Sequence, residues 1–160
     1  IDFLVGTFGK ALGSVGAYLV CPQLIKDYLI NAMRPLIFST ALPPINIAWT
    51  YFLFKRLEEW HEKRQHLAYL SQHLKQAVER ITGQISSSQS CIIPLLLGEN
   101  KNAVKMAQTL QAAGFYCLPI RPPTVPVGTA RIRLSLSAAM QKEQIDGLIY
   151  VLEKTCKVDC

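Results

Sequence analysis

A short motif near the start of the chain combines two glycines with a lysine. Gly6 and Gly9 are separated by two residues, and Lys10 follows directly. The phosphate-binding loop of nucleotide hydrolases needs four residues between its glycines and a Ser or Thr after its lysine. Ala11 stands at that last position and cannot bind magnesium. The motif is therefore not predicted to bind a nucleotide.

Two interpretations of Lys10 are open on composition alone. In the first, the motif is a tight turn between a strand and a loop, and the lysine faces solvent. In the second, the neighbouring Phe8, Leu12 and Gly13 make a packed apolar setting. Such a setting disfavours the charged ammonium group, so that the neutral amine can act as a nucleophile or a base. The second interpretation would make Lys10 catalytic.

Two arginines alternate with apolar residues in a predicted strand at residues 130–136. Arg131 and Arg133 share one face, opposite Ile132 and Leu134. The planar fork of an arginine can clamp a carboxylate through two parallel hydrogen bonds. Two solvated arginines would give the same alternation, and the residues alone favour this plainer interpretation.

Three histidines lie along one predicted helix. His61, His66 and His73 are spaced five and seven residues apart. No pair has the four-residue spacing that lets two imidazoles on a helix bind one metal ion. We therefore predict a solvated face and no metal site.

The first part of the chain must position Lys10. Its predicted elements are a buried strand at 2–5, a strand at 16–21 that is apolar on both faces, a helix from Pro22 to Pro35, an extended stretch at 36–40 and a helix opening at Pro43. The helical pattern that opens at Pro43 continues to residue 81, and this stretch is long for a single helix of a globular protein. Because the segment 58–66 is rich in charge, we place a domain boundary there, between residues 1–60 and 61–160.

The second part reads as a small α+β domain. Its predicted elements are a strand at 91–97, a helix capped by Asn100 and closed by Gly114, a strand at 115–120, a proline-rich loop at 121–128, the arginine strand at 130–136 and a helix carrying Ile145, Leu148, Ile149 and Leu152. The order is strand, helix, strand, strand, helix.

Composition excludes several classes of protein. Half of the residues are apolar, which excludes intrinsic disorder. The formal charge of +6 does not come from an unopposed basic patch, because glutamates interrupt the densest basic run, 55–64, so no nucleic acid is expected as a partner. No apolar run reaches the roughly 20 residues of a membrane-spanning helix, so no membrane is expected either.

Cysteine use indicates the compartment. The five cysteines are odd in number and form no C-x-x-C pair. We interpret them as reduced thiols of a cytoplasmic protein. The chain opens at Ile1 rather than Met, and residues 3–5 already have the composition of a core strand. We therefore expect it to be the C-terminal part of something longer.

Three motifs carry a resemblance to a known family. They are Thr7-Phe8-Gly9-Lys10-Ala11-Leu12-Gly13, then Phe38-Ser39-Thr40 with Leu42-Pro43-Pro44, and the run from Arg121 to Leu134. In order and spacing the chain resembles the α-oxoamine synthases, pyridoxal-phosphate enzymes of the aspartate-aminotransferase fold. The resemblance implies an α/β fold of type I, with the end of the large cofactor domain in residues 1–60 and the complete small domain in residues 61–160.

The resemblance also implies how the cofactor would be held. Lys10 would form the covalent aldimine with pyridoxal 5'-phosphate and then take the Cα proton of the substrate. Thr7 would contact the cofactor phosphate. Ser39 and Thr40 would reach the phosphate region of the other subunit's site, since the family builds each site across a homodimer.

The substrates follow from the same resemblance. Arg133 would pair with the amino-acid carboxylate, and Thr124 would lie in the substrate-binding loop. The proline-rich run is most similar to that of the acyltransferases that condense L-alanine with a pimeloyl thioester, with loss of CO2, in biotin biosynthesis. Whether coenzyme A or acyl carrier protein carries the acyl group stays open. The alternatives are members of the glycine C-acetyltransferase or 5-aminolevulinate synthase type, or a truncated, non-catalytic interaction module.

Two departures from the family pattern stand out. Met140 occupies the position where many members have a histidine after the Ala-Ala pair. The family's glycine-rich phosphate site and the aspartate that holds the pyridine nitrogen would precede Ile1. We therefore expect these 160 residues alone to be inactive.

Overall fold

The computed structural model describes residues 1–156. Within them the chain forms two compact units that divide between Trp60 and His61. Cys160, one of the five cysteines, lies outside the described residues. Along residues 1–156, no helix has both the length and the apolar character that crossing a membrane requires.

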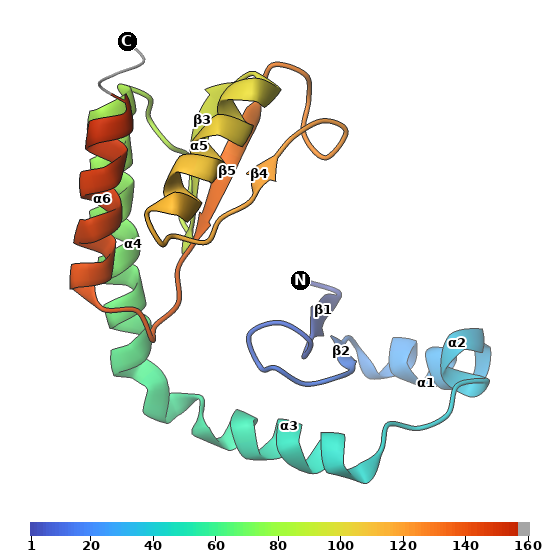
Figure 1. The fold of residues 1–160 in the computed structure, drawn as a ribbon. Coiled ribbons are helices and arrows are strands. Elements are labelled where there is room, and N and C mark those ends of the chain that lie inside the picture. The colour runs from blue at the N-terminus through green and yellow to red at the C-terminus, as the bar shows by residue number, and fades with distance from the viewer. Residues whose placement is uncertain (157–160) are drawn as a thin grey trace. The chain divides into compact units, whose positions relative to one another are not determined.

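Unit 1, residues 1–60, is a β-hairpin followed by helices (Figure 1). Its elements are β1 (Leu4–Thr7), β2 (Ala17–Val20), α1 (Gln23–Ala32), α2 (Arg34–Ile37), α3 (Pro44–Arg56) and the 3-10 turn η1 (Glu58–Trp60). The two strands pair antiparallel, with Leu4 opposite Val20 and Thr7 opposite Ala17. Prolines set the helix starts, because the fixed φ of Pro suits the first turn and its missing N–H is not needed there.

Two expectations for unit 1 are wrong. The strand predicted as buried is exposed: Phe3, Leu4 and Val5 are 54%, 47% and 68% accessible, and all of β2 is exposed too. The apolar composition of residues 3–5 is compatible with burial, but a strand becomes buried only where another layer of the protein packs against it. Among the described residues of unit 1, Leu53 is the one buried apolar side chain. Residues 36–40, predicted as extended, begin inside α2, a single turn that opens with proline.

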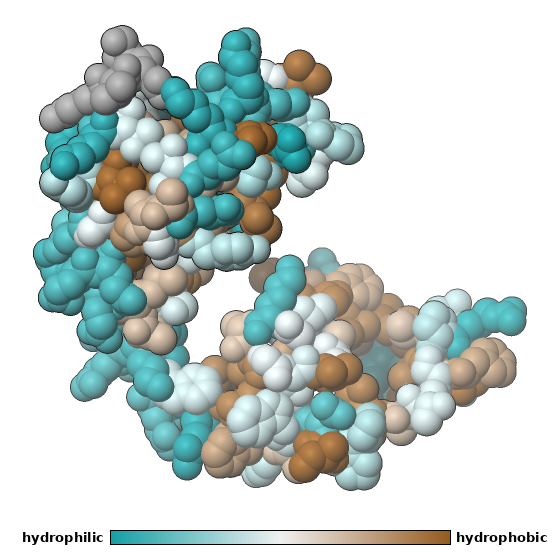
Figure 2. Space-filling model, in the orientation of Figure 1, coloured by the Kyte–Doolittle hydropathy of each residue, from teal (hydrophilic) through white to brown (hydrophobic). Residues whose placement is uncertain are grey.

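Apolar side chains therefore cover much of the surface of unit 1. Brown and tan residues are prominent along the elements from β1 to α3 in Figure 2. They include Val20, Leu24, Tyr28, Phe38, Ile45 and Phe54, each more than half accessible. Large apolar side chains gathered at a surface are typical of a region that another chain or segment covers.

Unit 2 confirms the predicted order of strand, helix, strand, strand, helix. Its elements are α4 (His61–Thr82), β3 (Ile92–Gly98), α5 (Asn100–Ala112), β4 (Pro119–Ile120), β5 (Ala130–Ser135) and α6 (Lys142–Cys156). The three strands form an antiparallel sheet in the order β3-β5-β4. The arginine strand is thus the central one.

Details of two elements in unit 2 differ from expectation. Asn100 is the first residue of α5, and Glu99 occupies the cap position without a side-chain hydrogen bond. Gly114 does close the helix, with φ at +89°. The strand predicted at 115–120 shrinks to its last two residues. One reason is that the carbonyl of Cys117 accepts a hydrogen bond of 2.6 Å from the Gln111 side chain instead of a strand partner.

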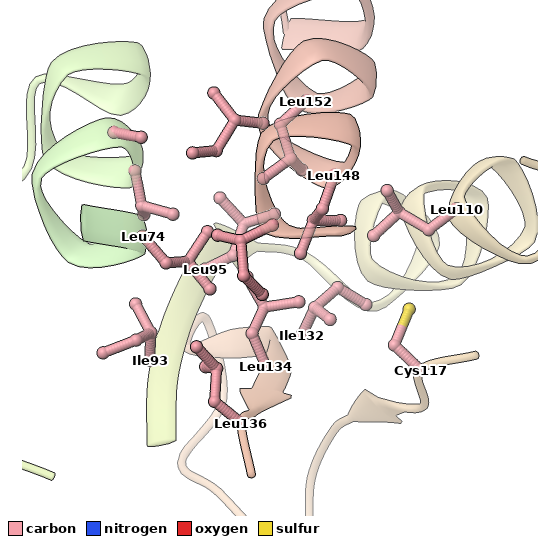
Figure 3. Close-up of a cluster of buried hydrophobic side chains, with 14 of the residues drawn as sticks. Leu74, Ile93, Leu95, Leu110, Cys117, Ile132, Leu134, Leu136, Leu148 and Leu152 are labelled. Atoms are coloured by element: carbon pink, nitrogen blue, oxygen red, sulfur yellow. The ribbon is translucent and has the colours of Figure 1, made fainter. Parts of the chain in front are cut away.

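The core of unit 2 lies between the sheet and its helices. Figure 3 shows side chains from β3, β5 and three helices converging on one cluster. The fully buried members are Leu70, Leu74, Ile93, Leu95, Leu110, Ile132 and Leu152. The four apolar positions predicted on the last helix, Ile145, Leu148, Ile149 and Leu152, are all buried. Each such side chain stabilises the fold by about 1.5–3 kcal/mol relative to exposure.

The prediction of a solvated histidine face is wrong for two of the three histidines. His73 is hydrogen-bonded to Asp146 on α6 at 2.6 Å. The ring of His66 is hydrogen-bonded to the Met140 carbonyl at 2.9 Å. His61 is exposed. In the part of the chain that the structure describes, no group of three or more His, Cys, Asp or Glu side chains is arranged to hold a metal ion.

Candidate active site

Lys10 lies in the loop that joins β1 to β2. Backbone hydrogen bonds close this loop: the Phe8 N–H donates to Gly16 O, and the Ser14 N–H donates to Phe8 O, both at 2.9 Å. Inside it, the Gly13 N–H donates to Lys10 O at 3.0 Å. Gly13 has φ at +53°, a conformation that glycine adopts without steric cost. The lysine therefore sits in a turn of defined backbone geometry.

Helix α3 holds the far side of this loop. The hydroxyls of Ser14 and Thr50 are 2.6 Å apart, and the Trp49 indole N–H lies 3.4 Å from Gly13 O. Gly13 and Ser14 lie three and four residues after Lys10 in the sequence. The loop is thus fixed to β1, β2 and α3 together.

The side chain of Lys10 is exposed. Within residues 1–156, no hydrogen bond or ion pair engages its amine. The packed apolar setting of the second interpretation is therefore not found around the amine. What the structure provides is an accessible primary amine on an anchored loop, which can react with a carbonyl ligand once its proton is removed.

Three hydroxyl side chains of unit 1 were predicted to contact a phosphate. Thr7 ends β1 and is exposed. Ser39 and Thr40 follow α2 and are also exposed, with the Ser39 hydroxyl donating to the carbonyl of Pro35. Thr7 and Lys10 lie on the same hairpin, whereas Ser39 and Thr40 belong to the segment between α2 and α3.

The two arginines of β5 have different surroundings. Arg131 is half-buried, and its Nε donates to the Thr129 carbonyl at 2.9 Å. Arg133 is exposed, stands opposite Pro94 of β3, and lines a hollow of about 370 Å³. Arg133 therefore presents its guanidinium to a ligand more freely than Arg131 does.

The hollow beside Arg133 has mostly apolar walls. Phe115, Tyr116, Met140 and Leu148 contribute to it. Met140, which stands where many family members have histidine, thus supplies an apolar side chain and a carbonyl bonded to His66, with no titratable group of its own. Thr124 lies elsewhere in unit 2, in a turn where its N–H donates to Arg121 O at 3.0 Å. It is exposed.

The predicted site residues thus divide between the units: Thr7, Lys10, Ser39 and Thr40 belong to unit 1, and Thr124 and Arg133 to unit 2. Sequence analysis missed the hydrogen bond between Ser14 and Thr50. The two residues are separated by 36 positions. The available signal was a serine within four residues of Lys10 in an otherwise apolar and glycine-rich loop.

The fold and the motif residues agree with one enzyme class. The chain belongs to the aminotransferase class I and II family, whose model matches residues 1–152. It has the α/β fold of the type I pyridoxal-phosphate enzymes. An 8-amino-7-oxononanoate synthase of Haemophilus ducreyi is 64% identical over 152 residues, which are 95% of this chain and 39% of that protein. The chain therefore spans about two fifths of the length of this curated relative.

Solved structures show the same fold. The 8-amino-7-oxononanoate synthase of Francisella tularensis has a TM-score of 0.85 and 26% identity, over 98% of this chain and 46% of its own. A lysine-to-alanine variant of serine palmitoyltransferase from S. paucimobilis, whose structure contains a bound aldimine of pyridoxal phosphate and myriocin, has a TM-score of 0.85 and 30% identity, over 99% of this chain and 41% of its own.

The side chains present suit pyridoxal phosphate as a ligand. The cofactor needs a primary amine for its aldehyde and hydrogen-bond donors for its phosphate. Lys10 offers an exposed amine, and Thr7 and Thr40 offer exposed hydroxyls. The Ser39 hydroxyl is exposed too, and its proton is donated to the Pro35 carbonyl. The donor set of unit 1 thus fits the cofactor of the family.

Proposed function

We propose that this chain supplies the cofactor lysine and the carboxylate-binding arginine of an 8-amino-7-oxononanoate synthase. That enzyme condenses L-alanine with a pimeloyl thioester to give 8-amino-7-oxononanoate, CO2 and the free thiol in biotin biosynthesis. The observation that carries the proposal is 64% identity, along 95% of the chain, to a relative of that name. The accessible amine of Lys10 on its anchored loop supports it.

Residues of unit 1 would hold the cofactor and move a proton. Bound pyridoxal phosphate supplies an electron sink for negative charge at the substrate Cα. Lys10 would hold the cofactor covalently and, once displaced by the amino acid, its amine would take the Cα proton as a general base. Thr7 would donate to the cofactor phosphate, and Ser39 and Thr40 would do so for the partner subunit of a homodimer.

Residues of unit 2 would hold the substrate. The Arg133 guanidinium would clamp the alanine carboxylate through two parallel hydrogen bonds. After the Cα proton has been removed, the Cα would attack the thioester carbonyl, and the thiol would leave as the C–S bond breaks. Thr124 would lie in the substrate-binding loop. The alanine carboxylate would then be lost as CO2, which gives the product.

Because the structural relatives include serine palmitoyltransferase, the choice of amino acid distinguishes the candidates. We propose alanine, whereas the alternatives of the glycine C-acetyltransferase or 5-aminolevulinate synthase type use glycine. The test is a thiol-release assay of the complete coding chain with pimeloyl thioester and each of alanine, glycine and serine. Release that depends on alanine supports the proposal. Release with glycine or serine but not alanine assigns another family member, and none with any of them favours a non-catalytic module.

The 160 residues by themselves should be inactive. The chain spans about two fifths of the relative's length, and the family's acid that holds the pyridine nitrogen finds no match in it. An alanine-dependent thiol release by the 160-residue chain alone would contradict this part of the proposal.

A further inference from the structure

The loop that carries Lys10 contains an unusual serine. Among the described residues, Ser14 is the one buried polar side chain, with 9% of its surface accessible. A buried hydroxyl is costly unless it is hydrogen-bonded. Ser14 finds its side-chain partner on α3, in the hydroxyl of Thr50 at 2.6 Å.

The direction of the hydrogen bonds can be assigned. The Thr50 hydroxyl donates to the carbonyl of Asn46, one turn earlier on α3, at 2.8 Å. Because a hydroxyl has one proton, Thr50 must accept the bond from Ser14. The Ser14 hydroxyl therefore donates to the Thr50 hydroxyl, and the Thr50 hydroxyl donates to the Asn46 carbonyl. Thr50 is thus the hydrogen-bond acceptor of the Ser14 hydroxyl.

The backbone of the loop depends on the same residue. The Ser14 N–H donates to Phe8 O, and the preceding Gly13 donates its N–H to Lys10 O. Trp49, next to Thr50 on α3, approaches Gly13 O with its indole N–H. The loop segment that follows Lys10 is thus held at Gly13 and Ser14 by two consecutive residues of one helix.

From these contacts we infer that Ser14 and Thr50 are positioning residues for Lys10. Their hydroxyl pair fixes the loop against α3, so that the lysine amine returns to one place each time the substrate displaces it. The inference rests on the proposed role of Lys10. It assigns no contact with substrate or cofactor to either hydroxyl. A misplacement of reacting groups by about 1 Å can cost on the order of a hundredfold in rate, so a part-buried hydrogen bond four residues away can matter.

The test compares two substitutions in the complete coding chain. Thr50→Val keeps the shape of threonine and removes the hydroxyl, whereas Thr50→Ser keeps the hydroxyl. Tyr51→Phe, which removes an exposed hydroxyl from the next residue of α3, is the matched control. The first readout is hydrogen exchange of the Gly13 and Ser14 amides in cofactor-free protein, and the second is the separation of kcat from the KM for alanine.

Thr50→Val should speed exchange of these two amides about tenfold, the effect of one lost buried hydrogen bond on a local opening equilibrium. In loaded enzyme it should lower kcat about tenfold or more and leave the KM for alanine unchanged. In Thr50→Ser and in Tyr51→Phe, the exchange rates of the two amides and kcat should both stay at the parental values.

Unchanged exchange in Thr50→Val, or equal impairment by Val and Ser, would overturn the inference. If Thr50→Val does not fold, Ser14→Ala replaces it, and amide exchange at the parental rate would be the contradicting result. Failure of the proposed function is a separate outcome. It would show as covalent cofactor label that persists after borohydride reduction of Lys10→Ala, whereas exchange in cofactor-free protein reports on the hydroxyl pair alone.

Discussion

His73 of α4 and Asp146 of α6 are joined by a hydrogen bond of 2.6 Å between Nε2 and Oδ1. The same carboxylate accepts a bond from Lys142 on its other oxygen. One carboxylate therefore links two helices that lie side by side in Figure 1, across 73 residues of sequence. Hydrogen bonds from Lys142 and His73 keep the pKa of Asp146 below its ordinary value.

This link should make the stability of unit 2 depend on pH. Because the folded state depresses the pKa of Asp146, the carboxylate stabilises the fold above the ordinary aspartate pKa, and the effect is lost as the pH falls through the depressed value. Asp146→Asn should therefore lower the denaturation midpoint at pH 7 and have a much smaller effect at pH 2. Urea titrations of both proteins at the two pH values measure this. Glu143→Gln on the same helix is the control. An equal difference in denaturation midpoint between the parent and Asp146→Asn at both pH values would contradict the account.

Core truncation should be costly in unit 2. Leu95 is fully buried on β3, within the cluster of Figure 3. Leu95→Ala should destabilise the unit by about 2–5 kcal/mol, because transfer and cavity terms add. Leu118→Ala removes the same atoms from a side chain that is 54% accessible and should cost far less. Denaturant unfolding compares the two, and similar losses would show that the cluster is not the stabilising core.

The two units should differ in hydrogen exchange. Among the described residues, Leu53 is the one buried apolar side chain of unit 1, and all others belong to unit 2. In the isolated 160-residue chain, amides of β3, β5 and α6 should exchange much more slowly than those of β1 and β2. Mass spectrometry of exchanged peptides gives this comparison. Strong, uniform protection of residues 1–60 in a monomer would refute the prediction.

Local sequence signals predicted most elements, and the failures have physical causes. Prolines and apolar periodicity placed α1, α3 and α6, because the fixed φ of proline and the helical spacing of apolar residues are local signals. Of these three helices, α6 buries its apolar face. The burial of residues 3–5 was predicted wrongly, since composition does not reveal which layer covers a strand. Strand β4 came out shorter than predicted because the Gln111 side chain satisfies the backbone at Cys117, a choice that depends on tertiary contacts.

The candidate site was predictable through its motifs and not through its contacts. The motif around Lys10 pointed to the lysine, but the Ser14–Thr50 bond joins residues 36 positions apart. Similarly, the alternation along β5 placed both arginines on one face and did not separate them. The difference appears in the structure, where Arg131 is half-buried and bonded to Thr129, and Arg133 is exposed. Each of the two lines a hollow of its own.

Substitutions of Arg133 should affect alanine selectively. In the complete enzyme, Arg133→Ala should lower kcat/KM for alanine by roughly two to three decades, the range expected when a charge-assisted pair with a carboxylate is lost. Arg133→Lys should also weaken alanine binding, because an ammonium cannot form the two parallel bonds. The apparent affinity for the thioester should change far less.

The matched control for this series is Arg131→Ala, which removes the same charge from the same face of β5. It should be comparatively mild, since Arg131 is bonded to the backbone of Thr129. Steady-state kinetics with varied alanine decide the matter. Small and equal effects of both substitutions, with the KM for alanine unmoved, would show that the carboxylate is held by another residue.

The central claim is that Lys10 holds pyridoxal phosphate, and borohydride trapping tests it most directly. Borohydride makes the bond between a lysine amine and the cofactor permanent, so that peptide mass spectrometry identifies the modified residue. In the complete coding chain incubated with pyridoxal phosphate, the account predicts stoichiometric label on Lys10, no label at the exposed Lys26 of α1, and loss of both label and turnover in Lys10→Ala. Equal labelling of several lysines, or retained synthase activity in Lys10→Ala, would contradict it.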